Sequence, residues 1–312
     1  EMYGRRETKH LFTVGECWMD DENEIIKHAH PNRNELVTLF QFDHFDKARK
    51  GKFTLTKDSD YDLNLTRDML VKWQNFTQKE GLIYTIFTDN HDQPRFLSRM
   101  LKKPELRYEG ATMLATMFYL LRGVPFIYQG QEIGVLNSSY QELSNYRDIE
   151  TLNFFKDNQK QHSPSQLLEM IQNGSRDNAR RPMPWSSDKH GGFSSVVPWI
   201  SENEDFLSVN VEEDLKSNHS IYQYYQSLFA LRKEPVWMEG AFIDRTGTHK
   251  NCFIYERRLK DESMLVVINF HVAQTIVLKD QISEVLLSNY PLSSQLPKEE
   301  YQPYQAVVYR LI

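Results

Sequence analysis

Four short apolar runs, each ending in polar residues, mark the first two thirds of the chain. They occupy residues 11–14, 36–42, 82–87 and 124–128. The runs are continuous rather than alternating, which is typical of parallel strands buried on both faces. Helical or polar stretches separate them, so the pattern predicts an α/β fold with a parallel sheet built from βα units.

Helices are predicted between and after these strands. One begins near a candidate N-cap at Thr66 and closes at Gly81, and a second carries a Met and Phe stripe over residues 113–121. A polar tract follows from about residue 134 to 217. Because a structureless loop of that length is unusual in a compact domain, we expect short helices within it, including one at residues 165–171.

A helix is predicted at residues 221–233, and Pro235 ends it. The pattern of apolar residues changes after this helix. Short β-rich runs then follow at residues 253–255, 264–270 and 306–309. They predict an antiparallel β-sandwich. We therefore divide the chain into an α/β region at 1–234, with an insertion at about 134–217, and a C-terminal sandwich domain at 235–312.

Composition narrows the classes of function. The net charge is -6, so the sequence does not show the excess of basic residues expected of a protein that binds nucleic acid or an anionic membrane. No apolar stretch is long enough to span a bilayer and no signal peptide is evident, so we expect a soluble, cytoplasmic protein. Cys17 and Cys252 lie far apart without metal-ligand spacing, so the sequence predicts neither a disulfide framework nor a zinc site.

Polar residues stand at the carboxyl end of every predicted strand. In a (β/α)8 barrel this edge carries the active site, so such residues are candidates for catalysis. The four groups are Gly15-Glu16, Asp43-His44, Asn90-His91-Asp92 and Gln129-Gly130-Gln131-Glu132.

Two of these carboxyl groups suit glycoside hydrolysis, which uses one acid and one charge-stabilising or nucleophilic carboxylate. Glu16 lies between Val14 and Trp18, and an apolar wall favours the protonated form of a carboxyl group. Asp92 lies beside His91 and Arg95, which favour the ionised form. We therefore predict Glu16 as the acid and Asp92 as the stabiliser of positive charge.

At this point the sequence resembles the α-amylase superfamily of glycoside hydrolases, in its branch of oligo-1,6-glucosidases, dextran glucosidases, α-glucosidases and trehalose-6-phosphate hydrolases. The resemblance covers essentially the whole chain. Its motifs are TVGE at 13–16, FQFDH at 40–44, NHDQPR at 90–95, GVPFIYQGQEIG at 123–134, YRDIE at 146–150 and SRDNAR at 175–180.

The resemblance implies a role for each matching residue. Glu16 corresponds to the family's general acid/base, and His91 with Asp92 to the pair that binds sugar hydroxyls and stabilises the transition state. Arg180 corresponds to an arginine that holds the terminal glucose. The implied activity is that of a retaining, exo-acting α-glucosidase on short oligosaccharides, without a cofactor or a metal.

Three departures from the family pattern stand out. Arg181 and Pro184 replace a smaller residue and a Gln, which we expect to alter the pocket rim. Gly51-Lys52-Phe53 stands where relatives often have Gly-Lys-Trp, so Lys52 is a candidate for the leaving-group subsite. The chain also starts before what resembles the fifth strand of the barrel, so the resemblance implies only strands 5 to 8 of a TIM barrel plus the sandwich.

The aspartate nucleophile of the family is absent from these 312 residues, because no Asp stands in a Gly-Phe-Arg-X-Asp context. We therefore expect the chain alone to be inactive. Exposed barrel edges predict self-association or pairing with the missing N-terminal half. A trehalose-6-phosphate hydrolase, with Lys52, Arg181 and Lys189 near the phosphate, is the main alternative, and a non-catalytic amylase-like protein is another.

Overall fold

The computed structural model describes residues 11–18, 21–56, 61–291 and 300–312 of the chain. Each of the four predicted parallel strands is present. They are β1 (Val14–Cys17), β2 (Thr38–Gln41), β3 (Thr85–Ile86) and β4 (Val124–Pro125). Three of them lie within their apolar runs, whereas the first begins only at Val14, the last residue of its run, and extends to Cys17, so Glu16 lies inside the strand. The predicted βα region is therefore confirmed at the level of its strands.

These strands run side by side in the order β1, β2, β3, β4. The pairs β1–β2 and β3–β4 are parallel ladders. Between the two pairs, the hydroxyl of Thr38 donates to the Ile83 carbonyl at 2.7 Å and that of Thr85 donates to the Leu39 carbonyl at 2.9 Å. Going from Thr38 to Leu39 on β2, the partner residue moves from Ile83 to Thr85 on the other chain segment, so residue numbers rise together. The strands β2 and β3 are therefore also parallel, and the carboxyl ends of all four strands meet at one edge.

A glycine permits the close approach of β3 and β4. Gly123 has φ +142°, and a Cβ atom there would lie 2.3 Å from the Tyr84 carbonyl oxygen. The amide of Val124 donates to that same carbonyl at 2.8 Å. Any larger residue at 123 would therefore disturb the start of the β3–β4 ladder.

Helices and short 3-10 turns connect these strands. Their bounds are α2 (Glu22–Ala29), η1 (Pro31–Arg33), α3 (Asp43–Asp46), α4 (Leu63–Lys79), α5 (Phe96–Met100), η3 (Pro104–Leu106), α6 (Arg107–Tyr119) and η4 (Gln131–Ile133). No helix in the described ranges has both the length and the apolar character needed to cross a membrane.

The predicted cap of α4 is wrong by one turn. Asp62 is the N-cap and its carboxylate accepts from the Asn64 amide at 2.8 Å. Thr66 lies inside the helix, where its buried hydroxyl donates to the His44 carbonyl at 3.2 Å. Asp, like Thr, is one of the residue types preferred at an N-cap, so both positions satisfy the preference on which the prediction rests. Gly81 does follow the helix end, with φ +66°.

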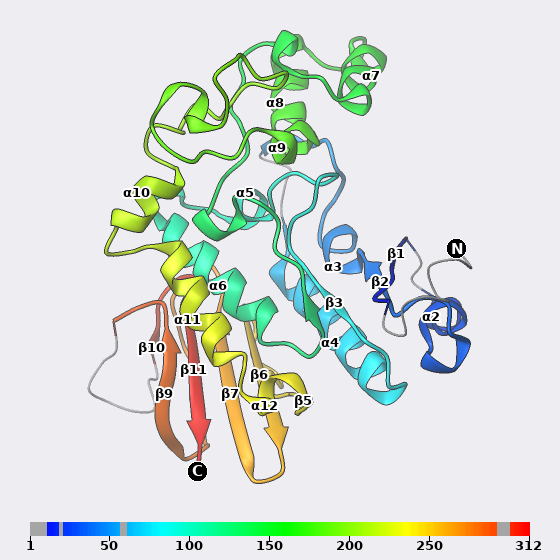
Figure 1. Ribbon diagram of the computed structural model, residues 1–312, viewed down its shortest axis with the longest axis vertical. Coiled ribbons are helices and arrows are strands. Elements are labelled where there is room, and N and C mark those ends of the chain that lie inside the picture. The colour runs from blue at the N-terminus through cyan, green and yellow to red at the C-terminus, as the bar shows by residue number, and fades with distance from the viewer. Residues whose placement is uncertain (1–10, 19–20, 57–60, 292–299) are drawn as a thin grey trace.

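The long polar tract contains short helices, as expected. They are η5 (Leu143–Asn145), α7 (Ile149–Asn158), α8 (Pro164–Gly174), α9 (Asp177–Arg180), η6 (Lys189–Gly192) and α10 (Val211–Lys216). A capping box formed by Ser163 and Gln166 begins α8. In Figure 1 the helices α7, α8 and α9 lie at the top of the molecule, at the end opposite the C-terminal sheet.

Two helices lead into the C-terminal strands, α11 (Ile221–Leu231) and α12 (Pro235–Met238). The strands are β5 (Ala241–Asp244), β6 (Cys252–Leu259), β7 (Glu262–Asn269), β8 (Gln274–Thr275), β9 (Ile282–Ser288), β10 (Glu300–Tyr301) and β11 (Ala306–Leu311). Five of them form an antiparallel sheet in the order β5-β6-β7-β11-β9, and β8 pairs with β10. The predicted antiparallel arrangement is confirmed.

The five-stranded sheet is buried on both faces. One face packs into the core that includes α4, α6 and α11, and the other face packs against side chains of the β8–β10 pair. Along β6, Phe253 and Tyr255 belong to the first core while Cys252 and Ile254 belong to the second. This alternation is the period of two that a strand imposes on its side chains.

Buried arginines join the end of α6 to the C-terminal part. Arg257 of β6 donates to the carbonyls of Leu120 and Gly240, each at 2.7 Å. Arg232, just after α11, donates to the carbonyls of Leu121 at 3.0 Å and Gly123 at 2.6 Å. Arg232 also donates to the carbonyl of Tyr119, the last residue of α6. The last carbonyls of a helix have no partner within the helix, and here a guanidinium group supplies one.

Candidate active site

Glu16 and Asp92 come from strands whose carboxyl ends meet at the same edge. Glu16 lies in β1 opposite Phe40 of β2, and its side chain is exposed. Asp92 lies on the loop that follows β3. Among the described residues, no hydrogen bond or ion pair joins the two carboxyl groups, so the common edge is what relates them.

The loop after β3 is shaped by its own polar side chains. Asn90 accepts a hydrogen bond from the Asp92 amide at 2.9 Å, and the buried Asp89 accepts from the Phe96 amide at 2.7 Å. Burial raises the pKa of Asp89, while the Arg95 guanidinium opposes that shift. These contacts hold the backbone in a turn that leaves the side chain of Asp92 partly exposed.

Three of the four predicted site residues lie together. The Arg180 guanidinium forms an ion pair with the Asp92 carboxylate, and its Nε donates to the His91 carbonyl at 2.8 Å. His91 Nε2 lies 3.3 Å from the other oxygen of Asp92. Arg180 comes from α9 in the insertion, so the site is built by two segments that are far apart in the sequence.

Sequence reasoning assigned no role to Arg176 or Asp148, which belong to the same cluster. Arg176 Nη1 lies 3.5 Å from Asp92 Oδ1, and its Nη2 lies 2.8 Å from Asp148 Oδ1. Arg180 Nη1 lies 3.5 Å from the same oxygen of Asp148. The spacing of the two arginines, four residues apart beside a short helix, was the signal in the sequence, because residues at that spacing share a helix face.

Asp148 also begins the helix α7. Its carboxylate accepts from the amide of Thr151 at 3.0 Å and from the hydroxyl of Thr151 at 2.9 Å. Burial disfavours the charged form, but the hydrogen bonds from Arg176 and Thr151 outweigh burial, and the pKa of Asp148 lies below its ordinary value. Asp148 is therefore an anionic anchor for both arginines.

A neighbouring carboxylate fixes the position of this anchor. The buried Asp177 of α9 accepts from the amides of Arg147 at 2.7 Å and Asp148 at 2.9 Å. The arginines and their anionic partner are thus tied to one another through the backbone as well as through side chains.

Lys52 connects to the cluster through one carboxylate. Its Nζ lies 2.5 Å from Glu150 Oε2, and the same oxygen lies 3.3 Å from Arg176 Nε. Burial lowers the pKa of Lys52, and Glu150 opposes that shift. The positive charge of Lys52 is therefore already paired.

The expectation that Arg181 shapes the pocket rim is wrong. Arg181 is buried and donates to the carbonyl of Leu136 and, at 3.3 Å, to that of Asn178. Burial lowers its pKa to about 10. The side chain supports the backbone of the insertion, so the alternative that places Arg181 near a substrate phosphate loses one of its three cations.

Three polar residues after the second and fourth strands have structural partners. Asp43 accepts from the indole of Trp73 at 3.1 Å. The ring of His44 is buried, lies 3.1 Å from the Phe87 carbonyl, and has its pKa lowered to about 3 by burial. The amide of Gln131 donates to the Tyr225 hydroxyl at 3.0 Å. Glu132 is partly buried, its Oε2 has no hydrogen-bond partner, and burial raises its pKa. Of the carboxylates at the strand ends, Glu16 is exposed and Asp92 is partly exposed.

A parallel-strand edge that carries an acidic residue, an Asn-His-Asp loop and an arginine from a following insertion is the arrangement expected of a glycoside hydrolase. Residues 2–240 match the family model described as alpha amylase, catalytic domain. The chain belongs to the α-amylase family.

Individual relatives are similar over almost all of this chain. The oligo-1,6-glucosidase of Parageobacillus thermoglucosidasius is 34% identical over 313 aligned positions, which cover 96% of this chain and 55% of that protein. The oligo-1,6-glucosidase of Halalkalibacterium halodurans is 37% identical, with coverage of 96% and 54%. The chain spans about half the length of these relatives.

A solved structure shares the fold. The trehalose-6-phosphate hydrolase of Bacillus licheniformis aligns with a TM-score of 0.88 at 32% identity, covering 96% of this chain and 56% of that one. The trehalose-6-phosphate hydrolase of Bacillus subtilis is also 32% identical, with coverage of 96% and 55%.

Proposed function

We propose that this chain contributes the acid/base and glucose-binding side chains of a retaining, exo-acting α-glucosidase of the oligo-1,6-glucosidase or dextran glucosidase type. The observation that carries the proposal is the cluster in which Arg180 holds Asp92 and His91 at the end of β3. The names of the relatives support the same class of activity.

Each side chain has a distinct task in this proposal. Glu16 protonates the leaving glycosidic oxygen and later removes a proton from the attacking water. Asp92 and His91 hydrogen-bond the sugar hydroxyls, and the negative charge of Asp92 favours the oxocarbenium-like transition state. Arg180 fixes the orientation of Asp92 and closes the pocket around the terminal glucose.

The covalent step requires an aspartate that these 312 residues do not supply in the family's sequence context. In the proposed architecture, β1 to β4 are the fifth to eighth strands of a (β/α)8 barrel, and residues 235–312 form the appended sandwich domain. The other four strands of the barrel, which carry the nucleophile, pair with the edges of β1 and β4. Two copies of the chain could meet through the same edges.

Trehalose-6-phosphate hydrolysis is the second candidate, because relatives of that name are equally long matches. It requires free cations near the distal sugar. Lys52 is ion-paired with Glu150 and Arg181 donates to backbone carbonyls, so two of the three cations proposed for the phosphate are engaged. This observation favours neutral oligosaccharides.

The test uses two proteins, the 312-residue chain and the gene product that contains it. We expect the latter to release glucose from isomaltose and the chain alone to release none. Glu16→Gln in the active form should lower kcat by about 10²- to 10⁴-fold, the usual contribution of general acid/base catalysis. Glu24→Gln on the exposed face of α2 is the matched control and should leave kcat unchanged.

Contrary outcomes are distinct. Strong glucose release by the chain alone would contradict the need for an outside nucleophile. Activity confined to trehalose 6-phosphate would select the second candidate, and a Glu16→Gln enzyme with unchanged kcat would remove Glu16 from the mechanism.

A further inference from the structure

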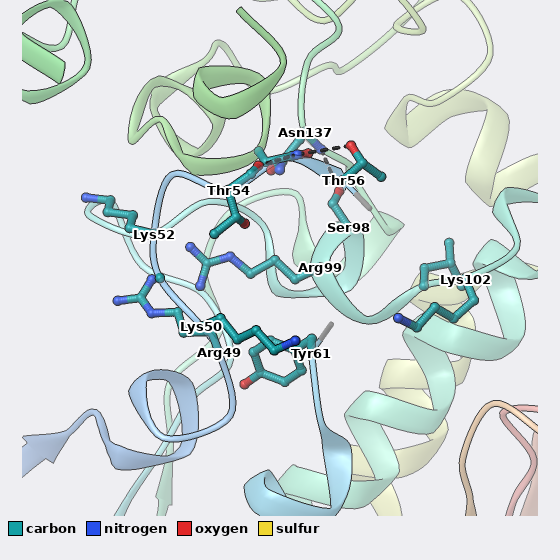
Figure 2. Close-up of a pocket in the computed structure, with 13 residues that line it drawn as sticks. Arg49, Lys50, Lys52, Thr54, Thr56, Tyr61, Ser98, Arg99, Lys102 and Asn137 are labelled. Carbon is teal, nitrogen blue, oxygen red and sulfur yellow. Dashed lines mark hydrogen bonds between the residues drawn. The ribbon is translucent and has the colours of Figure 1, made fainter. Parts of the chain in front are cut away.

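A cavity of about 190 Å³ lies beside the Asp92 cluster but is lined by other residues. Its walls come from the segment after α3, from α5 and the residues that follow it, and from parts of the insertion. Figure 2 shows the labelled side chains around it. Because a water molecule occupies roughly 30 Å³ of liquid, the cavity has room for a small polyatomic ligand.

The lining of this cavity is strongly cationic. The described lining residues include five cations and no carboxylate: Arg49, Lys50, Lys52, Arg99 and Lys102. Arg49 is ion-paired with Asp46 and Lys52 with Glu150, and Lys102 also has an interaction partner. The positive charges of Lys50 and Arg99 are therefore the ones that an anionic occupant would offset.

Arg99 is the most informative member of the lining. Both terminal nitrogens of its guanidinium are buried and have no hydrogen-bond partner. The carboxylates that attract it through space, Asp46 and Asp89, are held by other groups, since Asp46 is ion-paired with Arg49 and Asp89 accepts from the Phe96 amide. Buried donors without acceptors are costly, and functional sites are where proteins tolerate them.

The charge of Arg99 persists at neutral pH. Burial, together with the neighbouring charge of Arg49, lowers the pKa of Arg99 to about 9, so Arg99 stays protonated at pH 7. A planar, charged guanidinium offers paired N–H groups that match two oxygens of a phosphate or a carboxylate.

Neutral donors complete the wall above the cations in Figure 2. The Ser98 hydroxyl oxygen accepts from the Asn137 amide at 2.7 Å, and its own proton is available to a ligand because a hydroxyl both donates and accepts. The Asn173 side-chain amide donates to the Thr54 carbonyl at 2.9 Å, which holds the wall in place.

We propose that this cavity binds a tetrahedral oxyanion, namely phosphate or the phosphoryl group of a small metabolite, with Arg99 as its main ligand and Lys50 as the supporting cation. Lys52 lines the same cavity but is paired with Glu150 and serves the Asp92 cluster instead. The oxyanion site is separate from the pocket proposed for glucose.

Hydrogen bonds connect the lining of this cavity to the loop after β3, which carries Asp92. Arg49 Nη1 donates to Gln93 Oε1 at 3.2 Å, directly after Asp92. Asn137 accepts from the Arg95 amide at 2.8 Å. A bound anion therefore contacts the groups that hold the loop after β3 at two points.

Calorimetric titration of inorganic phosphate into the full chain tests the proposal, with chloride keeping the ionic strength constant. We expect saturable binding, weakened by about 10- to 100-fold in Arg99→Met, as the loss of charge-assisted hydrogen bonds predicts. Lys50→Met, at an exposed side chain that should not disturb folding, should weaken it several-fold. Arg258→Met on β6 is the matched control and should bind like the parent.

Glucose 6-phosphate and glucose form the second arm of the experiment. Tighter binding of glucose 6-phosphate than of phosphate, lost in Arg99→Met, would identify a sugar phosphate as the ligand class, and equal binding would identify the free ion. The proposal is overturned if phosphate shows no saturable binding, if Lys50→Met and Arg99→Met both bind like the parent, or if Arg180→Met alone abolishes binding.

Discussion

The C-terminal sheet and the strand ends of the α/β region are stabilised by different kinds of contact. In the sheet, β6 and β7 pair over eight residues in register, and side chains on both faces enter continuous cores. At the strand ends, β3 and β4 pair over only two residues. There, side-chain hydrogen bonds and ion pairs replace the backbone ladder, and Figure 1 places α9, which carries Arg180, far from the sheet.

This difference separates stability from function. A ladder with buried side chains tolerates the loss of one polar group at its surface, because burial of apolar area dominates its free energy. The position of Asp92 instead depends on a few charged groups, namely Arg180, Arg176 and, through them, Asp148. Single polar substitutions should therefore affect the two regions differently.

The largest loss of stability is expected for Arg257, a residue of the C-terminal sheet whose buried side chain makes hydrogen bonds outside the backbone ladder. Arg257→Met leaves the carbonyls of Leu120 and Gly240 without their donor, at about 1–3 kcal/mol for each buried acceptor. Arg258→Met, at an exposed side chain of the same strand, removes one ion pair of the buried Glu256, which keeps its ion pair with Arg245, and should cost about 1 kcal/mol or less. Urea unfolding of both variants measures the difference.

Equal losses in the two variants would contradict the contrast between the buried and exposed arginines. A fall in the unfolding midpoint for Arg257→Met, with an unchanged slope against urea, would place its effect on the folded state.

Much of the fold could be predicted from apolar spacing. Three of the four parallel strands lie within their predicted runs and the C-terminal strands overlap theirs, because a buried strand leaves a local pattern of apolar residues. The first strand is shifted toward the carboxyl side of its run, over Val14–Cys17. His91, Asp92 and Arg180 stood in recognisable motifs and lie together. Their roles in catalysis stay predictions, as does the role of Glu16.

Other features depend on partners that spacing does not reveal. Arg181 is buried and donates to the carbonyls of Leu136 and Asn178, and a sequence does not show which charged residues will be buried. Asp148 is ion-paired with Arg176 while its amide donates to Asp177. Long-range side-chain pairing of this kind arises from the folded topology.

A second prediction concerns the anchor Asp148. Its pKa is lower in the folded chain than in the unfolded one, so its contribution to stability is complete above the ordinary aspartate pKa of about 3.9 and is lost as the pH falls through the folded value. Asp148→Asn should lower the free energy of unfolding at pH 7 by about 1.5–3 kcal/mol, the usual value for charge-assisted hydrogen bonds. Asn still serves as an N-cap for α7.

Urea unfolding at several pH values checks this second prediction. The loss of stability caused by Asp148→Asn should shrink as the pH falls below about 4, because the parent chain then loses the same charge. A difference between parent and variant that stayed constant across that window would show that the charge of Asp148 does not stabilise the cluster.

The smallest predicted effect tests whether side-chain bonds really replace the ladder between β2 and β3. Thr85→Val keeps the shape of a buried side chain and removes the hydrogen bond to the Leu39 carbonyl, at about 0.5–1.5 kcal/mol. Thr38→Val removes the companion bond to Ile83. Because the two bonds join the same pair of strands, the double variant should lose more stability than the sum of the single variants. Strictly additive losses in urea unfolding would mean that the two bonds act independently, and no loss in either single variant would mean that apolar packing alone keeps these strands together.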